Sequence, residues 1–330
     1  MKIIFLYLLK WLGVFNLTRF LIRKKTLILT YHGFEVIDET KFRPKLFIKK
    51  STFDQRLQYL KKHCNVIRLD ELSNENKINN SVVITLDDGW ASTLTIASPL
   101  LSHLNLPYSI YLTTEGVLSQ QPVFHILLEY MLRNSLGKTL CLMSGDHQLL
   151  KEIIKLEEIA NLTREIEKFK LTKYDTELLR KIADNLEFEI DEVIDKRIFN
   201  LLSMSEVKEL SKLGADIQLH THSHHNYVDE EPAFSVEIKV NQSHIENITG
   251  IKPIHHCYPS GRFNQLCFNY LQSLGIETAT TCIPGFCDRT SHKLKLPRFL
   301  DGENIPQIVF EAEVSGVLEL LRKFKRTLLS

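Results

Sequence analysis

The amino-acid sequence predicts an α/β fold in which helices cover a mainly parallel β-sheet. Apolar runs of strand length alternate with helical segments along most of the 330-residue chain, and the most polar motifs directly follow two of those runs. Chemistry at the carboxyl ends of parallel strands is typical of (β/α) barrels. A doubly wound open sheet is the alternative, although no glycine-rich nucleotide-binding pattern follows any predicted strand.

The first part of the alternation ends near residue 113. Its first strand, residues 26–31, is apolar and stops at His32 and Gly33, and the run at 82–87 is rich in β-branched residues. Strands are predicted at 26–31, 66–69, 82–87 and 108–113, and helices at 51–62 and 90–104.

Residues 118–201 interrupt this pattern. They are rich in Leu, Ile, Glu and Lys at helical spacing, and no strand pattern is evident among them. A structureless loop of this length is uncommon in a compact domain. We therefore predict a mostly helical insertion that lies outside the barrel, near the end of strand 108–113.

The alternation resumes after residue 201 and continues to the C-terminal segment. Short apolar runs again precede helical stretches, as expected for further strand–helix units. Strands are predicted at 215–219, 254–258, 276–280 and 294–298, and helices at 205–213, 233–248, 262–273 and 305–324.

The N-terminal residues 1–25 form a segment apart from the main domain, residues 26–330. Residues 3–9 are apolar, but Lys10 ends a run that is too short to span a bilayer, and no small-residue cleavage site follows it. We predict an amphipathic or anchoring helix that either contacts a membrane surface or packs on the main domain. The location is therefore left open between cytoplasmic and membrane-associated.

The composition excludes some classes of function. With 44% hydrophobic and 25% charged residues the chain is not disordered, and a net charge of +1 gives no electrostatic basis for a nucleic-acid partner. The six cysteines include no CxxC pair, so we interpret them as reduced thiols.

Two polar motifs predict a metal site. Asp87-Asp88-Gly89 ends the strand at 82–87, and His220-Thr221-His222-Ser223-His224 follows the strand at 215–219. One Asp and the two histidines at i and i+4 can bind a divalent metal if the chain turns helically, which leaves the other Asp as a base. An Asp pair before Gly is also common in ordinary turns. The turn at Pro259-Ser260-Gly261 can offer backbone N–H groups to an oxyanion.

Together these motifs resemble those of the NodB-homology polysaccharide deacetylases. That family has a TFDDG-like motif, an H-[ST]-x-S-H motif and a P-x-G motif, which Thr85–Gly89, His220–His224 and Pro259–Gly261 match in this order. The resemblance covers residues 26–117 and 202–300. It implies a distorted barrel of about seven parallel strands and the hydrolysis of N-acetyl or O-acetyl groups on a glycan or polysaccharide.

The resemblance also implies roles for single residues. Asp87 would be the catalytic base, and the divalent metal, expected to be Zn²⁺, would be held by Asp88, His220 and His224. Tyr258 and Ser260 would lie at the oxyanion and substrate, with the backbone N–H of Ser260 stabilising the oxyanion.

Two departures from the family pattern give two further candidates. The arginine usually found just before the third-motif proline is missing, so Arg298 is the candidate that tunes the base. The usual C-terminal Leu-x-His is missing as well, since no histidine follows His292. The chain thus resembles the circularly permuted branch that includes the poly-N-acetylglucosamine deacetylases, in which the acid histidine precedes the Asp-Asp motif. This implies His32 as the general acid.

Two other functions remain open at this stage. The same barrel can hydrolyse an amide on a non-carbohydrate substrate, and a relative without activity can bind glycans. Retention of all five polar residues of the motifs argues against the second alternative.

Overall fold

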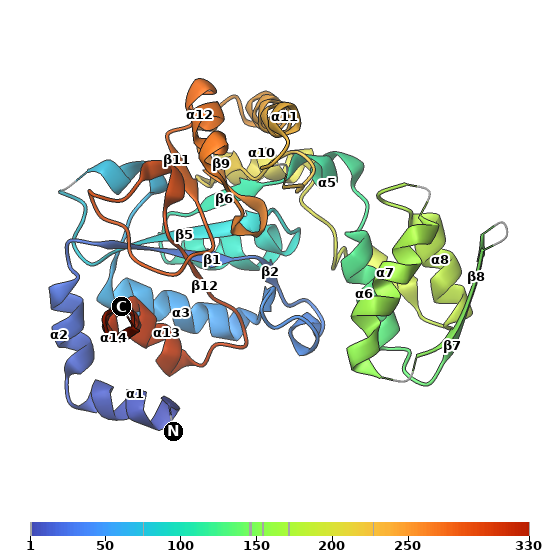
Figure 1. Ribbon diagram of the computed structural model, residues 1–330, viewed down its shortest axis with the longest axis horizontal. Coiled ribbons are helices and arrows are strands. Elements are labelled where there is room, and N and C mark those ends of the chain that lie inside the picture. Colours follow the sequence, from blue (N-terminus) through green and yellow to red (C-terminus); the bar gives the residue numbers. More distant parts are fainter. Residues whose placement is uncertain are drawn as a thin grey trace.

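A parallel β-sheet forms the centre of the computed structural model, which describes residues 2–74, 76–144, 147–153, 155–170, 172–226 and 228–329 (Figure 1). The strand order is β11-β10-β9-β6-β5-β1-β12, and every neighbouring pair is parallel. The short strand β4 pairs with the first two residues of β5, ahead of the stretch of β5 that pairs with β6. The prediction of a distorted barrel of about seven parallel strands is confirmed. The strands are β1 (Thr26–Tyr31), β4 (Asn65–Val66), β5 (Ser81–Asp88), β6 (Ser109–Leu112), β9 (Asp216–Leu219), β10 (His255–Cys257), β11 (Thr278–Thr280) and β12 (Phe299–Leu300).

The segment before β12 joins the two ends of this row of strands. Leu296 forms a parallel bridge with Thr280 of β11, and β12 pairs with β1 at the opposite end of the sheet. The strand predicted at 294–298 lies instead at Phe299–Leu300, because Lys293–Lys295 form a 3₁₀ turn. The sheet therefore curls, and residues 296–298 lie close to strands that are distant in the sequence.

Helices cover both faces of the sheet, so its strands are buried on both sides. In β1, for example, all six residues are buried. The predicted helix 90–104 is instead a π-helical turn, Thr93–Ala97, followed by α4, and the predicted helix 305–324 is broken at Gly316, whose φ is +82°. The covering helices are α3 (Lys50–His63), α4 (Ser98–His103), α5 (Thr114–Ser119), α10 (Met204–Lys212), α11 (Glu231–Thr249), α12 (Gln265–Ser273), α13 (Gln307–Val314) and α14 (Val317–Leu329).

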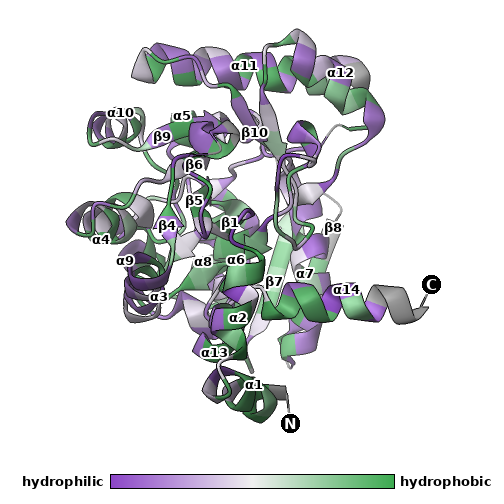
Figure 2. Ribbon diagram, turned by 90° about the vertical axis from the view of Figure 1, so that its left-hand side faces the viewer, coloured by the Kyte–Doolittle hydropathy of each residue, from purple (hydrophilic) through white to green (hydrophobic). Residues whose placement is uncertain are grey.

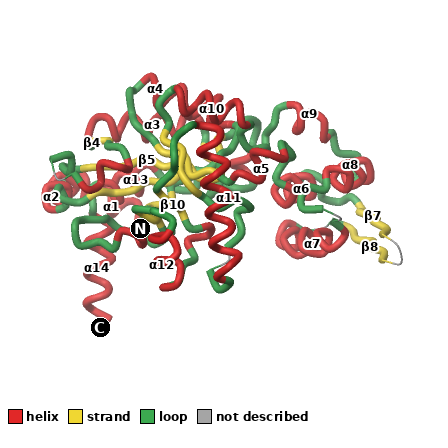
Figure 3. The backbone as a smooth tube through the Cα atoms, turned by 90° about the horizontal axis from the view of Figure 1, so that it is seen from above, coloured by secondary structure: helices red, strands yellow, loops and turns green. Residues whose placement is uncertain are grey.

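Helices α6 (Phe124–Arg133), α7 (Ile159–Ile166), α8 (Thr176–Asn185) and α9 (Ile190–Asp195) form a lobe beside the barrel (Figures 1 and 3). We call residues 124–195 the side lobe. It also contains an antiparallel hairpin of β7 (Thr139–Ser144) and β8 (His147–Glu152), although no strand pattern is evident in residues 118–201 of the sequence. The hairpin is separate from the central sheet. Leu140 and Leu142 are buried and Met143 is exposed, but the outward residues Cys141 and Met143 are also apolar and hide the alternation.

The N-terminal segment forms two helices, α1 (Lys2–Trp11) and α2 (Val14–Leu21), rather than one. Gly13 separates them with a φ of +77°, a conformation that favours glycine. Within the described residues no single helix is long and apolar enough to cross a membrane. The two helices reach that length and composition only as a pair bent by 81°. Figure 2 shows both beside α13 and α14.

Candidate metal centre and active site

The carboxyl ends of three strands bring the predicted polar residues to one rim of the barrel. His32 directly follows β1, Asp87 and Asp88 end β5, and His220 directly follows β9. Tyr31 pairs with Leu86, Asp88 with Leu112, and Leu112 with Leu219, so the ends of β1, β5 and β9 reach the rim together. His32, Asp87, Asp88 and His220 line a pocket of about 790 Å³ between the barrel and the side lobe.

Asp88 and two histidines form the first cluster in this pocket. The Oδ1 atom of Asp88 lies 3.3 Å from Nε2 of His220 and 3.3 Å from Nε2 of His224. All three potential ligand atoms lie within 4.8 Å of one another. The structure thus brings together the three residues predicted as metal ligands.

The surroundings of this cluster fit a divalent metal. Oδ1 of Asp88 is buried but has no hydrogen-bond partner among the described residues, whereas Oδ2 accepts a hydrogen bond of 3.0 Å from Nε1 of Trp90. Nδ1 of His220 lies 2.8 Å from the carbonyl oxygen of Cys257. A proton on Nδ1 donated to that carbonyl leaves the Nε2 lone pair directed at Asp88, which is the usual arrangement of a metal-binding histidine.

The loop that carries the histidines is not helical, so the expected helical turn after the strand is wrong. Thr221 and His224 have φ values of 62° and 57°, and Asp88 across the cluster has a φ of 72°. Positive φ is uncommon for residues other than glycine and concentrates at functional sites. His222 points away from the cluster, since its Nδ1 lies 2.9 Å from Oγ1 of Thr114.

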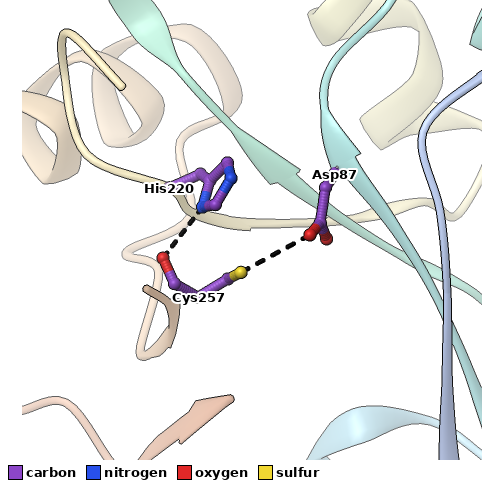
Figure 4. A group of neighbouring side chains, drawn as sticks. All are labelled: Asp87, His220 and Cys257. Atoms are coloured by element: carbon purple, nitrogen blue, oxygen red, sulfur yellow. Dashed lines mark hydrogen bonds between the residues drawn. The ribbon is translucent and has the colours of Figure 1, made fainter. Parts of the chain in front are cut away.

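Asp87 forms a second cluster with Arg298 and Cys257. Nη1 and Nη2 of Arg298 donate to the two carboxylate oxygens of Asp87 at 2.8 and 2.9 Å, and Nη2 lies 3.0 Å from Sγ of Cys257. Sγ of Cys257 also lies 3.5 Å from Oδ2 of Asp87, as Figure 4 shows. The arginine missing from the third motif is therefore replaced in space by Arg298, which enters from the segment before β12.

The electrostatics of the site keep both carboxylates ionised. Burial raises the pKa of Asp87, but Arg298 and then His220 and His32 outweigh it, so the pKa lies below its ordinary value. Burial is likewise outweighed at Asp88, chiefly by His224, and the pKa of Asp88 is strongly lowered. Burial lowers the pKa of His224 to about 4, which keeps this imidazole neutral and able to act as a ligand at pH 7.

His32 lies beside Asp87 in the same pocket. Its Nε2 is 3.9 Å from Oδ2 of Asp87, and its side chain remains 17% exposed to the pocket. Nδ1 of His32 is buried and has no hydrogen-bond partner within the part of the chain that the structure describes. At 3.9 Å the contact between His32 and Asp87 is electrostatic, since it is too long for a hydrogen bond.

The Pro259–Gly261 turn borders the same pocket. Ser260 has a φ of 56°, and a Cβ on Gly261 would lie 2.7 Å from the backbone nitrogen of Cys282. The backbone N–H of Tyr258 donates to Thr280 at 3.2 Å, so it is already engaged. The backbone N–H of Gly261 donates to the carbonyl oxygen of Tyr258 at 2.8 Å, and Ser260 itself lines the pocket.

Two contributors to the site were not predicted as site residues. Trp90 follows the Asp-Asp-Gly motif, and its hydrogen bond to Asp88 was not foreseen because a buried tryptophan fits a core equally well. Cys257 lies just before the third-motif proline, in the region that lacks the usual arginine. The absence of that arginine was the available signal, since a smaller residue there makes room for Arg298.

The comparisons with known proteins agree with this arrangement. A family model described as polysaccharide deacetylase matches residues 74–279, which is more than half of the chain. No curated protein gives a significant match. Among solved structures, deacetylase PplD of Streptococcus pyogenes in complex with acetate has a TM-score of 0.58 and 17% identity, and the match covers 89% of this chain and 97% of that one.

Two further solved structures share the fold. A de-N-acetylase from Aggregatibacter actinomycetemcomitans has a TM-score of 0.54 and 13% identity, with coverage of 88% of this chain and 99% of that one. IcaB from Ammonifex degensii has a TM-score of 0.53 and 14% identity, with coverage of 88% and 97%. The barrel and the matched family model define a hydrolase that acts on carbon–nitrogen bonds other than peptide bonds. The chain belongs to the polysaccharide deacetylase family.

Proposed function

We propose that this protein is a metal-dependent deacetylase that removes N-acetyl groups from a glycan or polysaccharide. One observation carries the proposal: Asp87 is held by Arg298 and lies 3.9 Å from His32, in the same pocket as the Asp88–His220–His224 cluster. A base, an acid and a ligand set at a single rim are the parts that hydrolysis of an amide requires.

The ligand set is suited to a divalent metal, for which we propose Zn²⁺. One carboxylate and two imidazoles leave an open position, as in catalytic rather than structural zinc sites. Such a metal, held by Asp88, His220 and His224, would polarise the acyl carbonyl and lower the pKa of bound water.

The side chains around the cluster then have separate tasks. Asp87 is ionised and accepts the proton of the attacking water, while Arg298 fixes the direction of its carboxylate. The backbone N–H of Ser260 donates to the developing oxyanion. His32 in its protonated form donates to the leaving amine, and loss of such an acid costs a factor of roughly 10² to 10⁴ in rate.

The proposed role of His32 supports N-acetyl rather than O-acetyl groups as the substrate. A sugar amine is a poor leaving group unless it is protonated as the bond breaks, and His32 lies where it can supply that proton. Amide hydrolysis on a non-carbohydrate substrate uses the same groups, so the substrate panel must include such amides.

Release of acetate from a panel of acetylated glycans and non-carbohydrate amides tests the function. We expect release from N-acetylated glycans, its loss after treatment with a chelator, and its recovery when Zn²⁺ is added. Release from the non-carbohydrate amides alone would contradict the glycan substrate. Full activity of metal-free protein would contradict metal dependence.

Metal analysis of His220→Ala tests the ligand set separately. The variant should retain well under a tenth of the metal of the parent protein, since one of three ligands is lost. The exposed His103 on α4 offers a matched control, because His103→Ala removes an imidazole far from the pocket and should leave metal content unchanged. A full complement of metal in His220→Ala would disprove the assignment.

A further inference from the structure

The helices α1, α2 and α14 share a large exposed apolar surface. Trp11 is 81% exposed, Ile4 74% and Phe324 66%, although side chains of this size usually pack inside a protein. We call this surface the α1–α2–α14 face. Its exposed apolar residues are Ile3, Ile4, Phe5, Tyr7, Leu8, Trp11, Leu12, Leu17, Phe20, Leu21, Leu320, Leu321 and Phe324.

The face is mounted on the main domain rather than loosely attached to it. Leu6 and Phe15 are buried in a cluster with Ile308, Ala312 and Val317 of α13 and α14. The Lys10 ammonium group forms an ion pair with Glu311 of α13. The inward sides of α1 and α2 therefore hold both helices in place, and their outward apolar side chains have no covering element among the described residues.

Positive charge accompanies the apolar side chains. Residues 2–25 contain six lysines and arginines and no acidic residue, and two of the six, Lys10 and Lys25, form ion pairs with Glu311 and Asp288. The guanidinium group of Arg23 lies 4.0 Å from the ring centroid of Phe20, and Lys24 is exposed. On α14 the single acid, Glu319, is paired with Arg322, and Lys325 is exposed.

We propose that the α1–α2–α14 face docks on the surface of an anionic lipid bilayer. Apolar side chains beside lysines and arginines match the boundary between acyl chains and negative headgroups. The bend of 81° between α1 and α2 favours helices that lie in this interface over a single span. A second copy of the chain would bring the same positive charges together, which opposes self-association through this face.

The proposal also fixes which way the site points. Helix α2 of the face directly precedes β1 and lies at the amino ends of the strands, whereas the pocket opens at their carboxyl ends toward the side lobe (Figure 1). The six residues of β1 alone separate the two ends by roughly 20 Å. Given the proposed deacetylase function, the substrate is then a glycan that stands away from the lipid surface rather than a lipid headgroup.

The two tryptophans allow a direct test with the full-length protein. Trp11 is on the face, and Trp90 is buried beside the metal cluster. Vesicles of phosphatidylglycerol and phosphatidylcholine should co-sediment the protein, and their brominated lipids should quench one exposed tryptophan. Phosphatidylcholine vesicles alone should bind much less. Trp11→Phe should bind nearly as well but lose the quenching, which assigns the signal to Trp11.

Variants then separate the apolar and the charged contributions. Ile4→Glu should abolish binding, and Lys24→Gln should weaken it roughly fivefold, as expected for one positive charge near an anionic surface. Ile251→Glu, at an equally exposed position away from the face, should bind as the parent does.

Three outcomes would overturn the proposal. They are failure of the parent protein to bind anionic vesicles, equal loss of binding in Ile251→Glu, and a stable dimer in solution that Ile4→Glu converts to monomer. Vesicle binding does not depend on catalysis, so it distinguishes failure of the docking proposal from failure of the proposed function. Bound protein that no longer hydrolyses a soluble acetylated oligomer would contradict the proposed direction of the site.

Discussion

At the scale of single residues, Asp87 depends on a partner from a remote part of the chain. The pKa of Asp87 lies below its ordinary value chiefly because Arg298 opposes the effect of burial. Both carboxylate oxygens are engaged by the guanidinium group, so their direction is fixed before any substrate arrives. We therefore propose that Arg298 is a positioning residue that acts through Asp87, the proposed base.

Replacement of Arg298 should change the pH dependence of the reaction. In Arg298→Ala burial dominates, the pKa of Asp87 rises, and the base is protonated at a higher pH than in the parent. The acid limb of the kcat/KM profile should then move to higher pH, and the rate at neutral pH should fall. Arg298→Lys keeps the charge but loses the two-pronged geometry, so its shift should be smaller.

Metal content serves as the control for both arginine variants, since Arg298 does not contact the three proposed ligands Asp88, His220 and His224. An acid limb that stays in place in Arg298→Ala, at unchanged metal content, would rule out the positioning role.

Replacement of His32 tests the general acid. His32→Ala should keep its metal and lose roughly 10² to 10⁴ in rate on N-acetyl substrates. Activated aryl esters should suffer less, because their leaving groups need no proton. Equal loss on amides and esters would indicate a structural role instead.

His32 and Arg298 also show how the sequence could reveal parts of the site. The motifs around Asp87, Asp88, His220 and His224 are contiguous and can be read directly. The other two were found only because expected residues were missing elsewhere. No local pattern distinguishes them, since their closeness to Asp87 is created by the pairing of β1, β5 and β12.

At the scale of elements, continuous apolar runs predicted the central strands well, because burial on both faces demands such runs. The bounds of elements were predicted less accurately where a turn sets the start or the end of the element. The strand before Phe299 was placed too early, and the helix through Gly316 was drawn as continuous. Both errors arise from local backbone geometry that apolar spacing does not report.

The side lobe supplies one wall of the pocket and should influence which glycan is used. Phe124, Lys170 and Tyr174 line the pocket opposite the catalytic rim, and the Lys170 ammonium group lies 4.7 Å from the ring centroid of Phe124. Tyr174→Ala and Lys170→Ala should each change kcat/KM by up to about tenfold, and by different factors for different glycans.

Metal content should be unaffected by these changes, since neither residue belongs to the ligand cluster. Met143→Ala on the exposed hairpin is the matched control and should behave as the parent. Identical losses on every glycan would show that the lobe does not select the substrate.

At the scale of the whole molecule, a buried ion pair ties the closing segment to the helical layer. Nε of Arg56 on α3 donates to Oδ2 of Asp301, just after β12, at 3.0 Å. Burial raises the pKa of Asp301 to about 6, although Arg56 opposes it. The folded protein thus holds a proton at Asp301 that the unfolded chain releases near pH 4.

This raised pKa predicts how stability changes with pH. The contribution of Asp301 is fully present below pH 4 and is lost as the pH rises to about 6, at a cost of about 3 kcal/mol. The side chain of Asp301→Asn does not titrate. Between pH 4 and pH 7 the free energy of unfolding of this variant, measured with urea and taken relative to that of the parent, should therefore rise by about that amount. Parallel curves for the two proteins would contradict the prediction.

The route by which Arg298 reaches Asp87 has a consequence for biosynthesis. The two residues are 211 positions apart, so a ribosome needs roughly 10 to 40 s to make the arginine after the aspartate. Until then Asp87 has no guanidinium partner, and β1 lacks β12 along one edge. The nascent barrel therefore cannot mature before almost the whole chain has emerged. Early truncation products should be inactive and prone to capture by chaperones.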